Sequence, residues 1–119
     1  MIQGLDEYQD LAARTGRMNM SDGQKIAMGA MGLCGEAGEV SDYLKKVLFH
    51  ELPLDREKIK KELGDTLWYL AVLAHYLEIP LSEVADTNIE KLRLRYPRGF
   101  NPEDAAKRAD GEMIDQDHD

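Results

Sequence analysis

Hydrophobic residues recur every three or four positions along most of the chain, which is the spacing of one face of an α-helix. The pattern predicts four helices, over residues 5–15, 22–49, 56–77 and 82–96. Pro53, Pro80 and Pro97 mark where the last three of these segments begin or end. No segment has the alternating pattern of a β-strand. We therefore expect an all-α fold with an antiparallel four-helix core.

The second helix has a clear start and an unusual composition. Ser21 and Gln24 have the spacing of a capping box, in which each side chain bonds to the backbone N–H of the other residue. Four glycines then follow at intervals of three residues: Gly29, Gly32, Gly35 and Gly38. Each costs a helix about 1 kcal/mol relative to alanine. Their spacing predicts a surface that another backbone approaches closely.

The third helix is apolar on every side from Leu67 to Ala74. A helix of this kind is buried all round. A chain of 119 residues has little core in which to bury it. We therefore expect it to pack against a second copy, in at least a dimer.

Composition places the chain among soluble globular proteins. With 43% hydrophobic residues, it can form one domain, which we assign to residues 1–100, with a polar, acidic and loosely ordered tail over 101–119. The net charge of −8 argues against binding nucleic-acid polymers or anionic membranes. No signal peptide or membrane-length apolar run is present. A cytoplasmic location is expected.

The single cysteine, Cys34, excludes an internal disulfide and fits a reducing compartment. It lies in an apolar helical stretch with no histidine nearby. We expect it to be a packed core thiol.

Two pairs of carboxylates form the strongest chemical signal. Glu36 and Glu39 are three residues apart on the second helix, and Glu62 and Asp65 repeat this spacing on the third. A short connection predicts that these helices pack antiparallel, so that the pairs face each other. Clustered carboxylates beside a core repel one another, and a divalent cation offsets this cost. An all-oxygen set suits Mg²⁺, or Mn²⁺, better than zinc. Solvated helix residues are the plain alternative.

A di-iron centre of the helical-bundle type requires histidine three residues after an acid. None of the three histidines has that position relative to these acids. Iron is therefore disfavoured.

A second polar cluster lies on the fourth helix, where Asn88, Lys91 and Arg95 share one face. One amide and two cations can hold phosphate oxygens, although an ordinary polar face gives the same pattern. Trp68 and Gln9, together with Tyr8 and Tyr69, are candidates for contacts with a planar base; core packing is the alternative for Trp68. Lys46 shares a face with Glu39 and is a further candidate for phosphate.

These segments, in this order, resemble the MazG-like nucleoside triphosphate pyrophosphohydrolases. The resemblance is carried by residues 8–15, 32–40 (GLCGEAGEV), 61–70 (KELGDTLWYL), 88–92 (NIEKL) and 95–100. It implies an all-α dimer or tetramer that binds Mg²⁺ through Glu36, Glu39, Glu62 and Asp65. It also implies phosphate contacts from Asn88 and Lys91, assisted by Arg95.

The implied reaction is hydrolysis of nucleoside triphosphates to monophosphate and pyrophosphate, in the cleansing of nucleotide pools. Many members carry a second glutamate directly before the first metal ligand, where this chain has Gly35. The general base is therefore open: Glu36, Glu39 or a metal-bound hydroxide can serve. Two other functions stay open as well, a non-catalytic helical adaptor and hydrolysis of a related nucleotide such as phosphoribosyl-ATP.

Overall fold

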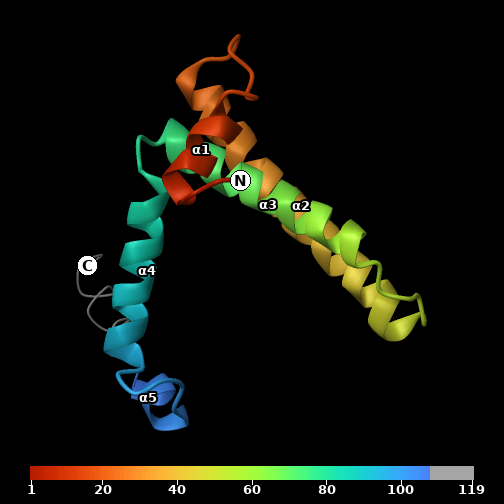
Figure 1. The fold of residues 1–119 in the computed structure, drawn as a ribbon, viewed down its shortest axis with the longest axis vertical. Coiled ribbons are helices and arrows are strands. Elements are labelled where there is room, and N and C mark those ends of the chain that lie inside the picture. Colours follow the sequence, from red (N-terminus) through yellow and green to blue (C-terminus); the bar gives the residue numbers. More distant parts are fainter. Residues whose placement is uncertain (108–119) are drawn as a thin grey trace. The chain divides into compact units, whose positions relative to one another are not determined.

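The computed structural model describes residues 1–107, and within this range every regular element is an α-helix (Figure 1). The helices are α1 (Leu5–Ala13), α2 (Asp22–Phe49), α3 (Arg56–Tyr76), α4 (Leu81–Arg95) and α5 (Pro102–Lys107). The all-α prediction is confirmed, and α1 to α4 correspond to the four helices expected from the hydrophobic pattern. α5 lies at the start of the segment predicted as a tail, of which residues 108–119 fall outside the described residues.

The chain divides into two compact units, Met1–Leu81 and Ser82–Asp119. In the first unit, α2 and α3 lie side by side as an antiparallel hairpin, and α1 packs against α3 (Figure 1). The second unit contains most of α4 and all of α5. A single four-helix core that includes α4, and its assembly into a dimer or tetramer, stay predictions.

Local capping fixes the start of both long helices. The Ser21 hydroxyl accepts from the Gln24 N–H (3.2 Å), and the Gln24 side chain accepts from the Ser21 N–H (3.0 Å), which confirms the predicted capping box. At the start of α3, the Asp55 carboxylate accepts from the N–H groups of Glu57 and Lys58. The buried Tyr43 hydroxyl accepts from the Asp55 N–H (2.8 Å), which ties the connection back to α2.

The buried hydrophobic core of the described chain is small. Its members are Ala12, Tyr43, Ala71, Val72, Ala74 and Leu81. By contrast, Leu63, Leu67 and Leu70 on α3 are 52%, 38% and 37% exposed. Part of the apolar stretch 67–74 is therefore at the surface of the single chain, and its burial against a second copy stays a prediction.

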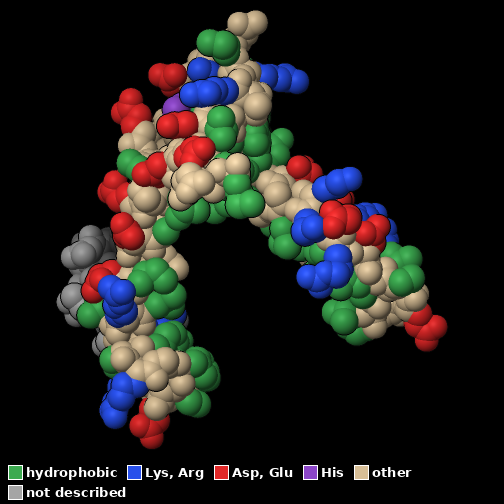
Figure 2. Space-filling model, in the orientation of Figure 1, with side chains coloured by type: hydrophobic (Ala, Val, Ile, Leu, Met, Phe, Trp, Pro, Cys, Tyr) green, Lys and Arg blue, Asp and Glu red, His purple; other side chains and the backbone are tan. Residues whose placement is uncertain are grey.

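Further hydrophobic side chains reach the surface at the far end of the α2–α3 hairpin, beside charged groups (Figure 2). They include Leu48 (72% exposed) and Phe49 (76% exposed) at the end of α2, and Leu52 and Leu54 in the connection.

Among residues 1–107, none of the helices combines the length and the apolar character that a membrane span requires.

The glycines of α2 fall into two groups. A Cβ atom at Gly29 would lie 3.1 Å from the Cβ of Leu73, and one at Gly32 would lie 2.6 Å from the Cζ of Tyr69. These two positions therefore allow α3 to approach closely, as the spacing predicted. A Cβ atom at Gly35 or Gly38 would meet no heavy atom within 4 Å.

The prediction for Cys34 was wrong for the single chain, because the residue is exposed. The close approach of α2 to α3 runs through Gly29 and Gly32, while Cys34 lies off that line of contact. Apolar neighbours in sequence did not reveal which face of α2 meets α3.

Candidate functional site

Three carboxylates meet where the middle parts of α2 and α3 pack together. One oxygen each from Glu36 on α2 and from Glu62 and Asp65 on α3 lie within 4.8 Å of one another. Antiparallel packing of the hairpin brings the two acidic motifs together, although they are separated by the whole α2–α3 connection. Glu36 and Glu62 are half-buried, and Asp65 is exposed.

The site is strongly negative. Burial raises the pKa of Glu36 above its usual value, and the charges of Asp65, Glu62 and Glu39 raise it further. Burial, followed by the charge of Asp65, also raises the pKa of the Tyr8 hydroxyl. The neighbouring carboxylates therefore oppose ionisation of Glu36, a cost that a bound cation removes.

The donor set fits a hard divalent cation. All three groups offer carboxylate oxygens, which Mg²⁺ prefers. Their oxygens lie within 4.8 Å of one another, which is close enough for all three groups to be ligands of one ion. Three protein ligands would also leave positions for water and for substrate oxygens.

Glu39 stands outside this group of three. Its side chain is exposed, and its charge still acts on Glu36 one turn away on the same helix. Its carboxylate is not among the oxygens that lie within 4.8 Å of one another. Its role as the fourth ligand stays a prediction.

An open pocket of about 330 Å³ adjoins the carboxylates. It is lined by Glu36, Asp65, Trp68 and Tyr69. The Trp68 indole N–H donates to the Thr15 hydroxyl (2.8 Å), and its ring meets the Tyr69 ring edge-on, with centroids 4.9 Å apart. Trp68 thus forms a fixed wall beside the acids, with its only polar atom already bonded. The predicted contact of Trp68 with a nucleotide stays a prediction.

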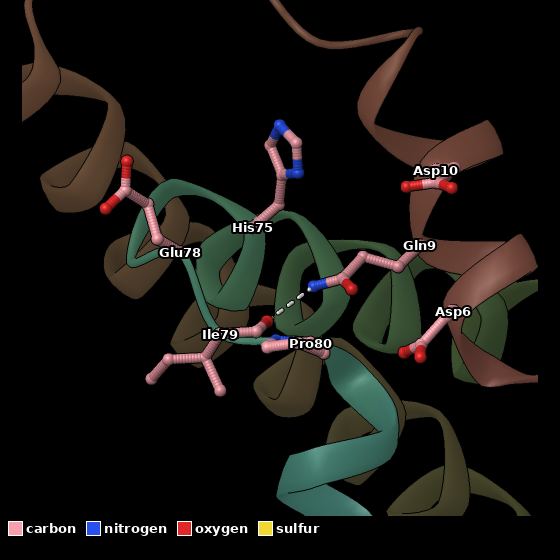
Figure 3. Close-up of a pocket in the computed structure, with 7 residues that line it drawn as sticks. All are labelled: Asp6, Gln9, Asp10, His75, Glu78, Ile79 and Pro80. Carbon is pink, nitrogen blue, oxygen red and sulfur yellow. Dashed lines mark hydrogen bonds between the residues drawn. The ribbon is translucent and has the colours of Figure 1, made fainter.

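Gln9 is buried, at 5% exposure. Its amide NH₂ group donates to the carbonyls of Ala71 (3.1 Å) and Ile79 (2.9 Å), and its oxygen accepts from the N–H of Leu81 (2.9 Å). Figure 3 shows the bond to Ile79 beside a pocket that Asp6, Asp10 and His75 also line. These three bonds give Gln9 a structural function. Its contact with a base stays a prediction.

The residues predicted to hold phosphate lie on α4, in the second unit. Asn88 is exposed, and Lys91 and Arg95 are half-buried. Arg95 also lies 5.9 Å from the centroid of the Tyr96 ring. Their contact with substrate stays a prediction. Lys46, on α2, forms an ion pair with Asp42 (3.1 Å). Lys46, and to a smaller extent Lys45, lower the pKa of the Asp42 carboxyl group.

A larger hollow was not foreseen from the sequence. It measures about 700 Å³ and is formed by the α1–α2 connection and the first half of α2. Its lining residues are Arg17, Asn19, Met20, Gln24, Ala27, Met28, Met31 and Gly32. Four of the six methionines of the chain fall between residues 18 and 31, a local excess that could have drawn attention to this segment.

Comparison with known proteins gives two matches. The sequence profile of the MazG nucleotide pyrophosphohydrolase domain matches residues 24–100, a range that contains all four acids and the three polar residues of α4. The chain is also 36% identical over 103 residues to the Gene 37 protein of Mycobacterium phage L5, covering 80% of this chain and 90% of that protein. No solved structure matches the chain significantly.

Proposed function

Because the chain belongs to the MazG nucleotide pyrophosphohydrolase family, we propose that it hydrolyses nucleoside triphosphates between the α and β phosphates. The products are a nucleoside monophosphate and pyrophosphate. The observation that carries this proposal is the meeting of Glu36, Glu62 and Asp65 beside an open pocket. A non-catalytic adaptor has no need of three carboxylates held this close together.

The proposed cofactor is Mg²⁺, held by Glu36, Glu62 and Asp65, with Glu39 as a fourth carboxylate after rotation of its side chain. When bound, Mg²⁺ neutralises phosphate charge and lowers the pKa of water. The ring of Trp68 forms one side of the pocket. The three carboxylates would hold the ion beside this pocket.

We assign the neutralisation of the charge on the departing pyrophosphate to the cations of α4. Lys91 and Arg95 would neutralise it, and Asn88 would donate a hydrogen bond to a phosphate oxygen. Lys46, which pairs with Asp42, is a further candidate. A proton leaves the attacking water as the bond to phosphorus forms, and Glu39, which stands outside the group of three acids, is proposed to accept it.

The direct test is to run the reaction in ¹⁸O-labelled water with a panel of nucleotides. Attack at the α-phosphorus places the label on the monophosphate, whereas label on pyrophosphate would show attack at the β-phosphorus. The panel should include phosphoribosyl-ATP, since hydrolysis of that substrate alone would assign a narrower function.

Variants test the residues. Glu62→Gln and Asp65→Asn keep side-chain size and remove charge, so each should lower kcat at least a hundredfold, as removal of one transition-state contact does. Glu57→Gln on α3 and Asp86→Asn on α4 are matched controls, since both residues are exposed and outside the acid cluster. Lys91→Ala should mainly raise KM. Near wild-type rates in both acid variants would show that these carboxylates take no part in the reaction, whereas a wild type without turnover would favour the adaptor.

A further inference from the structure

The hollow at the start of α2 and the acid pocket are neighbours along the same helix. Gly32 lines the hollow, and Glu36, one helical turn later, lines the acid pocket. Four residues of α-helix span about 6 Å. The two spaces therefore follow each other along α2, and the hollow extends away from the carboxylates toward the α1–α2 connection.

The Tyr69 ring lies between the two spaces, because it lines the acid pocket and packs against Gly32 of the hollow. It lies so close to Gly32 that a Cβ atom there would stand 2.6 Å from its Cζ. Trp68 supports the same ring from its edge. Because glycine occupies position 32, the Tyr69 ring can lie against the backbone of α2, where a larger residue would displace it.

The lining of the hollow combines two kinds of group. Met20, Met28 and Met31 present flexible, polarisable thioethers, which pack well against the faces of planar rings. Arg17, Asn19 and Gln24 offer donors and acceptors for the edges of such a ring. The Gln24 oxygen already accepts from the N–H of Ser21 (3.0 Å), which fixes this side chain and leaves its NH₂ group to donate.

The volume suits a nucleoside. At about 700 Å³, the hollow lies within the range of small-molecule sites. A nucleotide whose α-phosphate lies at Glu36 and Asp65 has its sugar and base within one to two helical turns of these acids. Along α2, that distance reaches Gly32 and Met28.

We propose that the base and sugar of the substrate occupy this methionine-lined hollow, with the Tyr69 ring against the sugar and Asn19, Gln24 and Arg17 at the edge of the base. The assignment rests on the proposed function and replaces Trp68 and Gln9 as the principal base contacts. Flexible methionines accommodate different ring shapes, so the hollow favours acceptance of more than one base.

Calorimetric titration with two ligands separates the base from the phosphates. One ligand is the α,β-imido analogue of each deoxynucleoside triphosphate, and the other is inorganic pyrophosphate, both with Mg²⁺. Met28→Trp fills the hollow, and Asn19→Ala removes a polar group from an exposed loop position. Met18→Trp is the matched control, because Met18 is 88% exposed and does not line the hollow.

We expect Met28→Trp to weaken binding of the analogues at least tenfold and Asn19→Ala to weaken it several-fold. Pyrophosphate binding should be unchanged in both, and Met18→Trp should match the wild type with either ligand. Unchanged binding of the analogues by both hollow variants would overturn the assignment.

Two further outcomes are informative. A wild-type protein that binds neither ligand would overturn the proposed function and, with it, the assignment of the hollow. If circular dichroism shows that Met28→Trp does not fold, Asn19→Ala and Arg17→Ala decide the question, and unchanged binding in both would overturn the assignment.

Discussion

The side-chain amide of Gln9 donates a hydrogen bond to the carbonyl of Ile79, 70 residues further along the chain. The same side chain also bonds Ala71 within α3 and the N–H of Leu81 at the start of α4. One buried residue of α1 thus satisfies backbone groups on both sides of the turn that ends α3. A base contact at this position would have to break bonds that already exist.

Gln9→Met keeps the size of the side chain and removes all three bonds. Because the buried N–H of Leu81 and the partly buried carbonyl of Ile79 then lose this partner, unfolding in urea should show a loss of about 2 kcal/mol. Gln3→Met, at an exposed position, should change stability little. If Gln9→Met raised KM at unchanged stability, Gln9 would be a substrate residue after all.

Glu78 adopts a positive φ of 60° at the end of α3. The N–H of Ile79 bonds to the carbonyl of Ala74, and the N–H of Glu78 bonds to that of His75, both at 2.9 Å, the pattern of a Schellman motif. Glycine is favoured at this position, so Glu78→Gly should stabilise the fold by about 1 kcal/mol. Ala30→Gly, inside α2, should lower stability by about 1 kcal/mol. Equal melting temperatures for the two variants would contradict this account.

Removal of divalent ions should lower stability, because Glu36, Glu62 and Asp65 then face one another uncompensated. Binding adds about 2.7 kcal/mol at a hundredfold excess of ion over Kd. The melting temperatures in Mg²⁺ and in chelator should therefore differ for the wild type and for Glu57→Gln. For Glu62→Gln the two melting temperatures should be nearly equal. In chelator, Glu62→Gln should melt above the wild type, since one repelling charge is gone. Identical melts of the wild type in both conditions would argue against the site.

Assembly should depend on the exposed leucines of α3. Leu63, Leu67 and Leu70 follow one another at helical spacing, and all are at least 37% exposed. Light scattering should give a multiple of the chain mass of 13.5 kDa, and Leu67→Glu should shift the population toward monomer. Ile2→Glu, before α1, should have no such effect. A wild-type mass of 13.5 kDa at micromolar concentration would refute this prediction.

Features set by neighbouring residues could be predicted from the sequence. The capping box of Ser21 and Gln24 depends on atoms within three residues. The meeting of Glu36 with Glu62 and Asp65 followed from two i,i+3 pairs on helices joined by a short connection. In each case local spacing and an antiparallel hairpin were sufficient.

Features that depend on how the helices pack against one another could not be predicted from local sequence patterns. The burial of Gln9 requires α1 to lie across the end of α3, and no pattern in the sequence specifies that placement. Exposure of Cys34 depends on which face of α2 meets α3. The methionine-lined hollow is shaped by the α1–α2 connection, whose course is not encoded by hydrophobic periodicity.

The open glycines of α2 have a consequence for how order spreads through the molecule. Gly35 and Gly38 flank Glu36 and gain nothing from close packing in the single chain, yet they lower the intrinsic helicity of the segment that carries it. Any ion bound by Glu36 must favour the ordered form of this segment. By reciprocity, whatever orders the segment also tightens ion binding. A nucleoside packed against Gly32, one turn earlier, would act on the ion in this way, so that base and metal would bind cooperatively through the backbone of one helix.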